Sequence, residues 1–152
     1  MKRWVLSAFL AVASCAGTLE PAEIAIGRDL CASCRMAIIS QATAAQIAAP
    51  GEEPRFFDDI ACLRDYLRAA APPDGAVIYV ADHRTGAWVD ARTAVFTDVP
   101  VTAEYTTTST PMASGLLAHA NISSRDADPA ARGGDPVLAS AILASPVRSI
   151  TP

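Results

Sequence analysis

The chain lacks any concentrated positive charge. Charged residues make up 18% of the 152 positions, and no run of lysine or arginine occurs. With a formal net charge of −4, the protein has no basic face to offer to phosphate backbones or anionic headgroups. The sequence therefore excludes nucleic acid as a partner. Hydrophobic residues account for 51% of the chain, which is typical of a globular protein long enough to bury one compact core.

The motifs of hydrolytic enzymes are also missing. We find no serine, histidine and acid arrangement for nucleophilic catalysis, and no glycine-rich loop that would cradle a phosphate. The chain contains only two histidines, His83 and His119. We therefore predict that the protein is not an enzyme.

The N-terminus has the pattern of a bacterial lipoprotein leader. A basic start, Met1-Lys2-Arg3, precedes an apolar run that is too short to span a bilayer as a mature helix. The run ends in Val12-Ala13-Ser14-Cys15, which looks like a lipobox. We expect residues 1–14 to be a signal peptide, Cys15 to be lipidated, and residues 15–28 to form a tether; an ordinary signal peptide is the alternative.

Such a leader predicts an address in the cell envelope. The protein would be anchored to the membrane through lipid and would face the periplasm, where several acyl chains give stable anchoring. Because residue 16 is alanine rather than aspartate, we expect the outer membrane. Lipidation would leave three of the four cysteines: Cys31, Cys34 and Cys62. Since three thiols cannot all pair in an oxidising compartment, a metal or a partner must hold some of them reduced, or one stays free.

The most informative motif is Cys31-Ala32-Ser33-Cys34-Arg35-Met36. Thiolates and thioethers together select Cu(I) over harder cations. Met1 would leave with the signal peptide, so Met36 and Met112 are the only methionines of the mature chain, and Met112 lies in a turn-prone stretch after Thr110-Pro111. A disulfide or a thiol-disulfide oxidoreductase remains an alternative for the CxxC pair, and a structural zinc site is a weaker one. Arg35, in the position that haem attachment would require to be histidine, excludes that reading.

The remaining candidate ligands are less specific. Cys62 falls in the first turn of a predicted helix, where a buried small hydrophobic role is the more common one. His83 lies in a turn and is expected to be solvated. His119 lies on an apolar segment close in sequence to Met112, so it is a candidate ligand beside a core interpretation.

Hydrophobic patterning indicates an α+β fold. A helix is predicted over residues 60–71, capped by Asp58 or Asp59, with Ile60, Leu63, Leu67 and Ala70 on its apolar side. Strands are predicted over residues 37–47, from 55, and over 76–80, 87–91, 93–96 and 115–120; residues 123–136 are irregular with one short helix near 129, and 137–144 favour a helix.

Several landmarks occur together in a recognisable order. They are the lipobox Cys15, the Cys31-x-x-Cys34-x-Met36 motif, Ala45-Gln46-Ile47, Phe57-Asp58-Asp59-Ile60-x-Cys62, Val80-x-Asp82-x-x-x-Gly86-x-Trp88-x-Asp90-Ala91 and Thr110-Pro111-Met112. In these features, which cover roughly residues 15–120, the chain resembles the NosL family of lipoprotein copper chaperones associated with nitrous oxide reductase.

The resemblance implies two strand-strand-helix-strand units packed as one compact domain over residues 29–152, with halves at 29–85 and 86–152. It also implies that the protein binds Cu(I) and delivers it to nitrous oxide reductase or to its membrane maturation complex. Carried over to this chain, the ligands fall on Cys34, Met36 and Met112, with Cys31 as a companion or exchange thiol. The family usually has glycine before the motif methionine, where this chain has Arg35; a glycine there would permit a positive φ.

Overall fold

The computed structural model describes residues 19–101 and 110–145. The predicted signal peptide, the lipidation site Cys15 and the start of the tether lie outside these residues. Within the described ranges, no helix combines the length and the apolar character needed to cross a bilayer.

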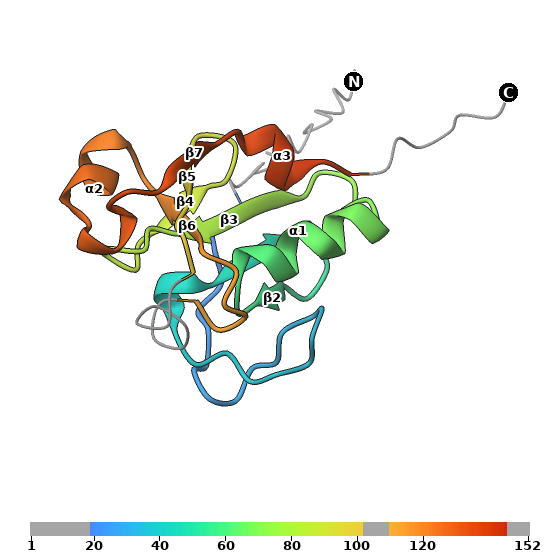
Figure 1. Cartoon of the computed structure of the whole chain (residues 1–152). Helices are drawn as coiled ribbons and strands as arrows, with labels where there is room; N and C mark the ends of the chain where they lie inside the picture. The colour runs from blue at the N-terminus through green and yellow to red at the C-terminus, as the bar shows by residue number, and fades with distance from the viewer. Residues whose placement is uncertain (1–18, 102–109, 146–152) are drawn as a thin grey trace, which may run out of the picture.

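Two antiparallel sheets form the framework of the domain (Figure 1). The first has the order β2-β1-β3-β4 and is built from β1 (Ala45–Ala48), β2 (Arg55–Phe57), β3 (Val77–Ala81) and β4 (Trp88–Asp90). The second has the order β6-β5-β7 and is built from β5 (Val95–Asp98), β6 (Leu116–His119) and β7 (Asp135–Val137). Helix α1 (Ile60–Ala69) connects β2 to β3, and α2 (Ile122–Ala127) connects β6 to β7.

The two sheets repeat one topology. In each, two consecutive strands are followed by a helix and a third strand, and the first strand of the three lies in the middle of the sheet. The predicted α+β fold with two strand-strand-helix-strand units is therefore confirmed. β4 comes after residue 86, in the part of the chain predicted to form the second half. It nevertheless pairs with β3 and so extends the first sheet.

One core joins the two units. Helix α1 contacts β1 and β2 of the first sheet, and also β6 and the short C-terminal helix α3 (Ala139–Leu143). Its buried face carries Ile60, Leu63 and Leu67, as the 3.6-residue pattern predicts, and these pack in one cluster with Phe96 of β5. Ala70, predicted on the same face, is instead the exposed C-terminal cap.

The predicted strand over residues 37–47 is mostly wrong. Only β1 is a strand there; residues 41–43 form a short 3-10 helix, η1 (Gln41–Thr43), because the Ser40 side chain accepts a hydrogen bond from the backbone N–H of Ala42. β7 was not predicted, because Pro136 is a poor strand residue. It is tolerated here since β7 lies at the edge of its sheet.

A buried carboxylate connects the first unit to the second. Asp82, 1% exposed at the end of β3, accepts hydrogen bonds from the backbone N–H groups of Arg84 and Thr85 and from Ala120 after β6. Burial alone would raise the pKa of this carboxyl, but these donors and the Ser124 hydroxyl lower it to about 2. The ionised form of Asp82 thus holds the end of β6 beside the end of β3.

Replacing this carboxylate tests the connection. Because the folded pKa is about 2 and the ordinary value is 3.8, the stabilisation is fully present above pH 3.8 and is lost as the pH falls through 2. Asp82→Asn is expected to lower the free energy of unfolding at pH 7 by about 2 kcal/mol. Urea denaturation at pH 7 measures the loss, with the surface variant Asp65→Asn as control. Equal stability of the two variants would contradict this role for Asp82.

Candidate metal centre

The CxxC motif lies in a loop ahead of β1, not at the start of a helix. Its first cysteine donates its backbone N–H to the carbonyl of Met36 at 2.8 Å, and the neighbouring Leu30 and Ala37 form an isolated antiparallel bridge. The segment is the blue portion before β1 in Figure 1. The loop therefore returns on itself and brings both cysteines to one end of the first sheet, where Ala32 also donates to the carbonyl of Phe56.

Three cysteines and one aspartate converge at this place. The Sγ atoms of Cys31, Cys34 and Cys62 and a carboxylate oxygen of Asp58 all lie within 4.8 Å of one another. All three cysteines are free thiols. Cys31 and Asp58 are completely buried, Cys62 is 5% exposed, and Cys34 is half-buried. This donor set could hold a metal ion, with Cys34 on the side nearest to solvent.

Sequence reasoning missed two members of the cluster. Cys62 is buried, as predicted for a small hydrophobic residue, but its thiol also contacts the sulfur of Cys31. Asp58 was considered only as a helix cap; Asp59 takes that role instead, and the carboxylate of Asp58 accepts hydrogen bonds from the Cys34 thiol at 3.5 and 3.7 Å. The available signal was the spacing Asp58-x-x-x-Cys62, which places both side chains at the start of α1.

The thiols differ in their ionisation. A hydrogen bond from Cys62 is the largest of the effects that lower the pKa of Cys31 to about 4, and burial opposes it. The backbone N–H of Cys34 also points at this sulfur, at 3.5 Å. The same interaction raises the pKa of Cys62, which stays a protonated donor, while burial raises the pKa of Cys34. Burial and the Cys31 thiolate raise the pKa of Asp58.

Both predicted methionine ligands are exposed beside this centre. Met36 is 51% and Met112 is 43% exposed, as expected for thioethers outside the core. Met112 is positioned by Asp59, whose carboxylate accepts the Met112 backbone N–H at 3.1 Å and the Ser114 hydroxyl at 2.7 Å. Since Asp59 directly follows Asp58, the Met112 turn is held next to the cysteine cluster.

The backbone is strained at the residue next to each methionine. Among the described residues, the only non-glycine positions with positive φ are Arg35, at 67°, which precedes Met36, and Ala113, at 50°, which follows Met112. Such conformations cost about 1 kcal/mol or more and persist where the surrounding structure enforces them, frequently at functional sites. Arg35 therefore adopts the positive φ that a glycine would permit at this position.

The histidines lie elsewhere. His119 is fully buried at the end of β6, and its Nε2 lies 2.9 Å from Asp128. His83, predicted to be solvated, also contacts Asp128, with its Nδ1 at 2.6 Å. The structure therefore places His119 in a separate cluster with His83 and Asp128.

The strain at Arg35 generates a stability prediction. Arg35→Gly is expected to raise the free energy of unfolding by about 0.5–1 kcal/mol, because glycine adopts positive φ at no steric cost. Arg28→Gly is the matched control: Arg28 is also exposed in a turn but has no positive φ, so this change should destabilise. Thermal denaturation of the metal-free protein compares them. If Arg35→Gly lost as much stability as Arg28→Gly, the inference that the backbone is strained at Arg35 would be wrong.

The ionisation of Cys31 can be measured directly. The folded thiolate persists down to a pH of about 4, whereas the unfolded thiol ionises near 9.0. Unfolding therefore takes up a proton between these values, so this group stabilises the fold more as the pH rises from 4 to 9. Thiolate absorbance of the reduced, metal-free protein at pH 7 should disappear in Cys31→Ser and remain in Cys34→Ser. If the absorbance instead disappeared in Cys34→Ser and remained in Cys31→Ser, Cys34 would be the ionised thiol.

No protein-family model matches this chain, and neither the curated proteins nor the solved structures give a match.

Proposed function

We propose that this protein is a Cu(I) carrier. The observation that carries the proposal is the convergence of three cysteine sulfurs in one cluster. Two exposed methionines are tied to its neighbourhood through their backbones, Met36 to Cys31 and Met112 to Asp59. Cu(I) is the ion that prefers thiolate and thioether ligands, and a pre-ionised Cys31 thiolate lowers the cost of deprotonation on binding. Cys31, Cys34 and Cys62 would supply thiolates, and Met36 and Met112 would supply thioethers on the solvent side.

The exposed methionines suit transfer rather than storage. A carrier must release its ion to ligands of an acceptor, which attack the metal before the donor's ligands leave. Met36 and Met112 are weak, neutral donors on the surface, so an acceptor can displace them first while the buried cysteines still hold the ion. The half-buried Cys34 would leave next, and the buried Cys31 last.

Thiol-disulfide exchange is less well supported. An oxidoreductase needs an accessible cysteine of low pKa to attack a substrate disulfide. In this protein the cysteine of low pKa, Cys31, is completely buried, whereas the pKa of the more accessible Cys34 is raised. The CxxC motif also lies in a loop and receives no support from a helix dipole.

Zinc is the second candidate ion. Three cysteines and the Asp58 carboxylate make four donors, the number that a closed tetrahedral zinc site requires. One feature favours Cu(I): a closed site of three cysteines and Asp58 would make no use of the exposed thioethers of Met36 and Met112.

The proposed location and the proposed acceptor rest on the sequence. We propose that the chain is a lipoprotein anchored through Cys15, that it faces the periplasm from the outer membrane, and that it acts without enzymatic activity of its own. Its resemblance to the NosL family supports nitrous oxide reductase, or the membrane complex that matures it, as the recipient of the copper.

Metal titration tests the carrier proposal. The reduced protein is expected to retain about one Cu(I) per chain against a chromogenic chelator, and to prefer it to Zn(II). Cys34→Ser and Cys62→Ser should each weaken Cu(I) binding by at least about 100-fold, because each removes a thiolate. No retained Cu(I), with Cys31 and Cys34 cycling through a disulfide, would establish exchange chemistry instead. Preferential retention of Zn(II) would establish a zinc site.

The methionine contribution needs a variant of its own within this titration. Because Met112 is exposed, Met112→Ala should weaken Cu(I) binding and leave the melting temperature of the metal-free protein nearly unchanged. Leu138→Ala, which shortens an even more exposed side chain outside the cluster, is the control and should change neither quantity. A lower melting temperature with unaltered Cu(I) affinity would show that Met112 has a packing role.

A further inference from the structure

Three side chains from separate segments converge beside the C-terminal end of β6, at one edge of the second sheet. His83 follows β3, His119 ends β6, and Asp128 lies between α2 and η2 (Pro129–Ala131). The Oδ2 atom of Asp128 lies 2.6 Å from Nδ1 of His83 and 2.9 Å from Nε2 of His119. These are the only two histidines of the chain, and both direct a nitrogen at the same oxygen.

Most of this cluster is shielded from solvent. His119 is completely buried, and its Nδ1 atom has no hydrogen-bond partner among the described residues. Asp128 is 5% exposed, so little water reaches the carboxylate that the rings share. The Nδ1 atom is not the one that faces Asp128: the contact to the shared carboxylate is made by Nε2.

We propose that His83, His119 and Asp128 form a second metal site, distinct from the cysteine cluster, for a divalent ion such as Zn(II) or Cu(II). Imidazole nitrogen and carboxylate oxygen are the donors that these ions prefer, and the set contains no sulfur that would select Cu(I). Two neutral rings and one carboxylate carry a single negative charge, which suits a dication.

The geometry needs only a small adjustment. The three donor atoms lie within 4.8 Å of one another. In a tetrahedral site with bonds of about 2.0–2.2 Å, donor atoms are separated by roughly 3.4 Å, so the Asp128 oxygen must withdraw from each ring by less than about 1 Å. The ion would then replace the two ring N–H contacts to Asp128, and each ring would carry its proton on the nitrogen that faces away from the metal.

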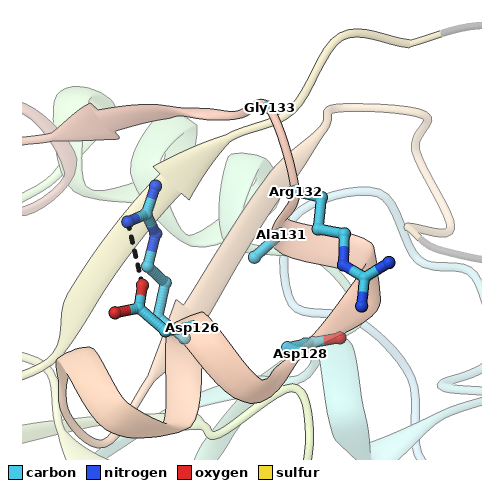
Figure 2. A pocket seen from close by; sticks show the side chains of 6 residues that line it. Asp126, Asp128, Ala131, Arg132 and Gly133 are labelled. Atoms are coloured by element: carbon cyan, nitrogen blue, oxygen red, sulfur yellow. Dashed lines mark hydrogen bonds and ion pairs between the residues drawn. The ribbon is translucent and has the colours of Figure 1, made fainter.

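A pocket lies beside one member of the cluster. A hollow of about 300 Å³ is lined by Asp128 and by residues of α2 and the η2 turn. Figure 2 shows Asp128 beneath Arg132 on one side of this hollow, with Asp126 on the other. The side chain of His83 is 16% exposed, which leaves an approach from solvent. Three protein donors would leave one coordination position for water or for another small ligand.

The site would also crosslink the fold. The backbone N–H of His83 donates to the carbonyl of Ala118, so the β3 end and β6 are already in contact. Asp128 belongs to the α2–η2 segment, which packs against β6 (Figure 1). An ion bound to all three residues would fix this segment to both strands, and its release would loosen the segment without disturbing the cysteine cluster.

Co(II) is the probe that separates the two metal sites. Co(II) bound to cysteine gives an intense sulfur-to-metal charge-transfer band, whereas a histidine and carboxylate site gives only the weaker visible d–d bands. Titration of the purified, reduced protein with Co(II) is expected to show both components. The sulfur-free component should saturate at one ion per chain and should be displaced by Zn(II).

Matched variants assign the sulfur-free component. Asp128→Asn keeps the cap to Ala130, and His83→Ala removes a half-buried ring; each should weaken this component by at least about 100-fold and leave the sulfur band unchanged. Asp126→Asn, at the other side of the pocket, should bind as the wild type does. Proton NMR should show both histidine rings shifting on addition of Zn(II). A sulfur-free component that is absent, or that survives in Asp128→Asn and His83→Ala, would overturn the proposal.

Discussion

The structure of the cysteine centre depends on one pair of adjacent aspartates. Asp59 accepts the backbone N–H of Ala61 and so begins α1, and its other contacts hold the Met112 turn from the second unit. Asp58, one residue earlier, accepts a hydrogen bond from the Cys34 thiol. Because both carboxylates are completely buried, each must have its donors in place, and this requirement fixes three distant segments around the start of one helix.

The two halves share a topology but contribute differently. The first unit supplies every member of the cysteine cluster, from the loop before β1 and from the first turn of α1. The second supplies Met112 at one end and, at the other, His119 and Asp128, which meet His83 from the end of β3 in the first unit. One fold duplicated within a chain thus provides soft sulfur donors in one place and nitrogen and oxygen donors in another, which suits ions of different chemistry.

Much of the local structure was predictable from short-range patterns. Ile60, Leu63 and Leu67 recur at helical spacing, and a β-branched run marks β3, so these elements follow from periodicity alone. Residues 37–47 show where prediction from short-range patterns fails. Alanine packs equally well in a strand or a turn, and the hydrogen bond from Ala42 to the Ser40 hydroxyl decided the outcome against a long strand. The strand β7 depends on pairing with β5, which no local pattern encodes.

The sequence by itself predicted a sulfur-rich site, because it places two thiols and a thioether, Cys31, Cys34 and Met36, within six residues. It also favoured an exposed Met112, because this methionine follows Thr110-Pro111 in a turn-prone stretch. Only the tertiary structure decided that Cys62 joins the cluster and that His119 does not. Both decisions rest on contacts between segments distant in the chain: Cys62 with Cys31, and His119 with Asp128 across α2. Such contacts depend on how the units pack, which residue spacing does not specify.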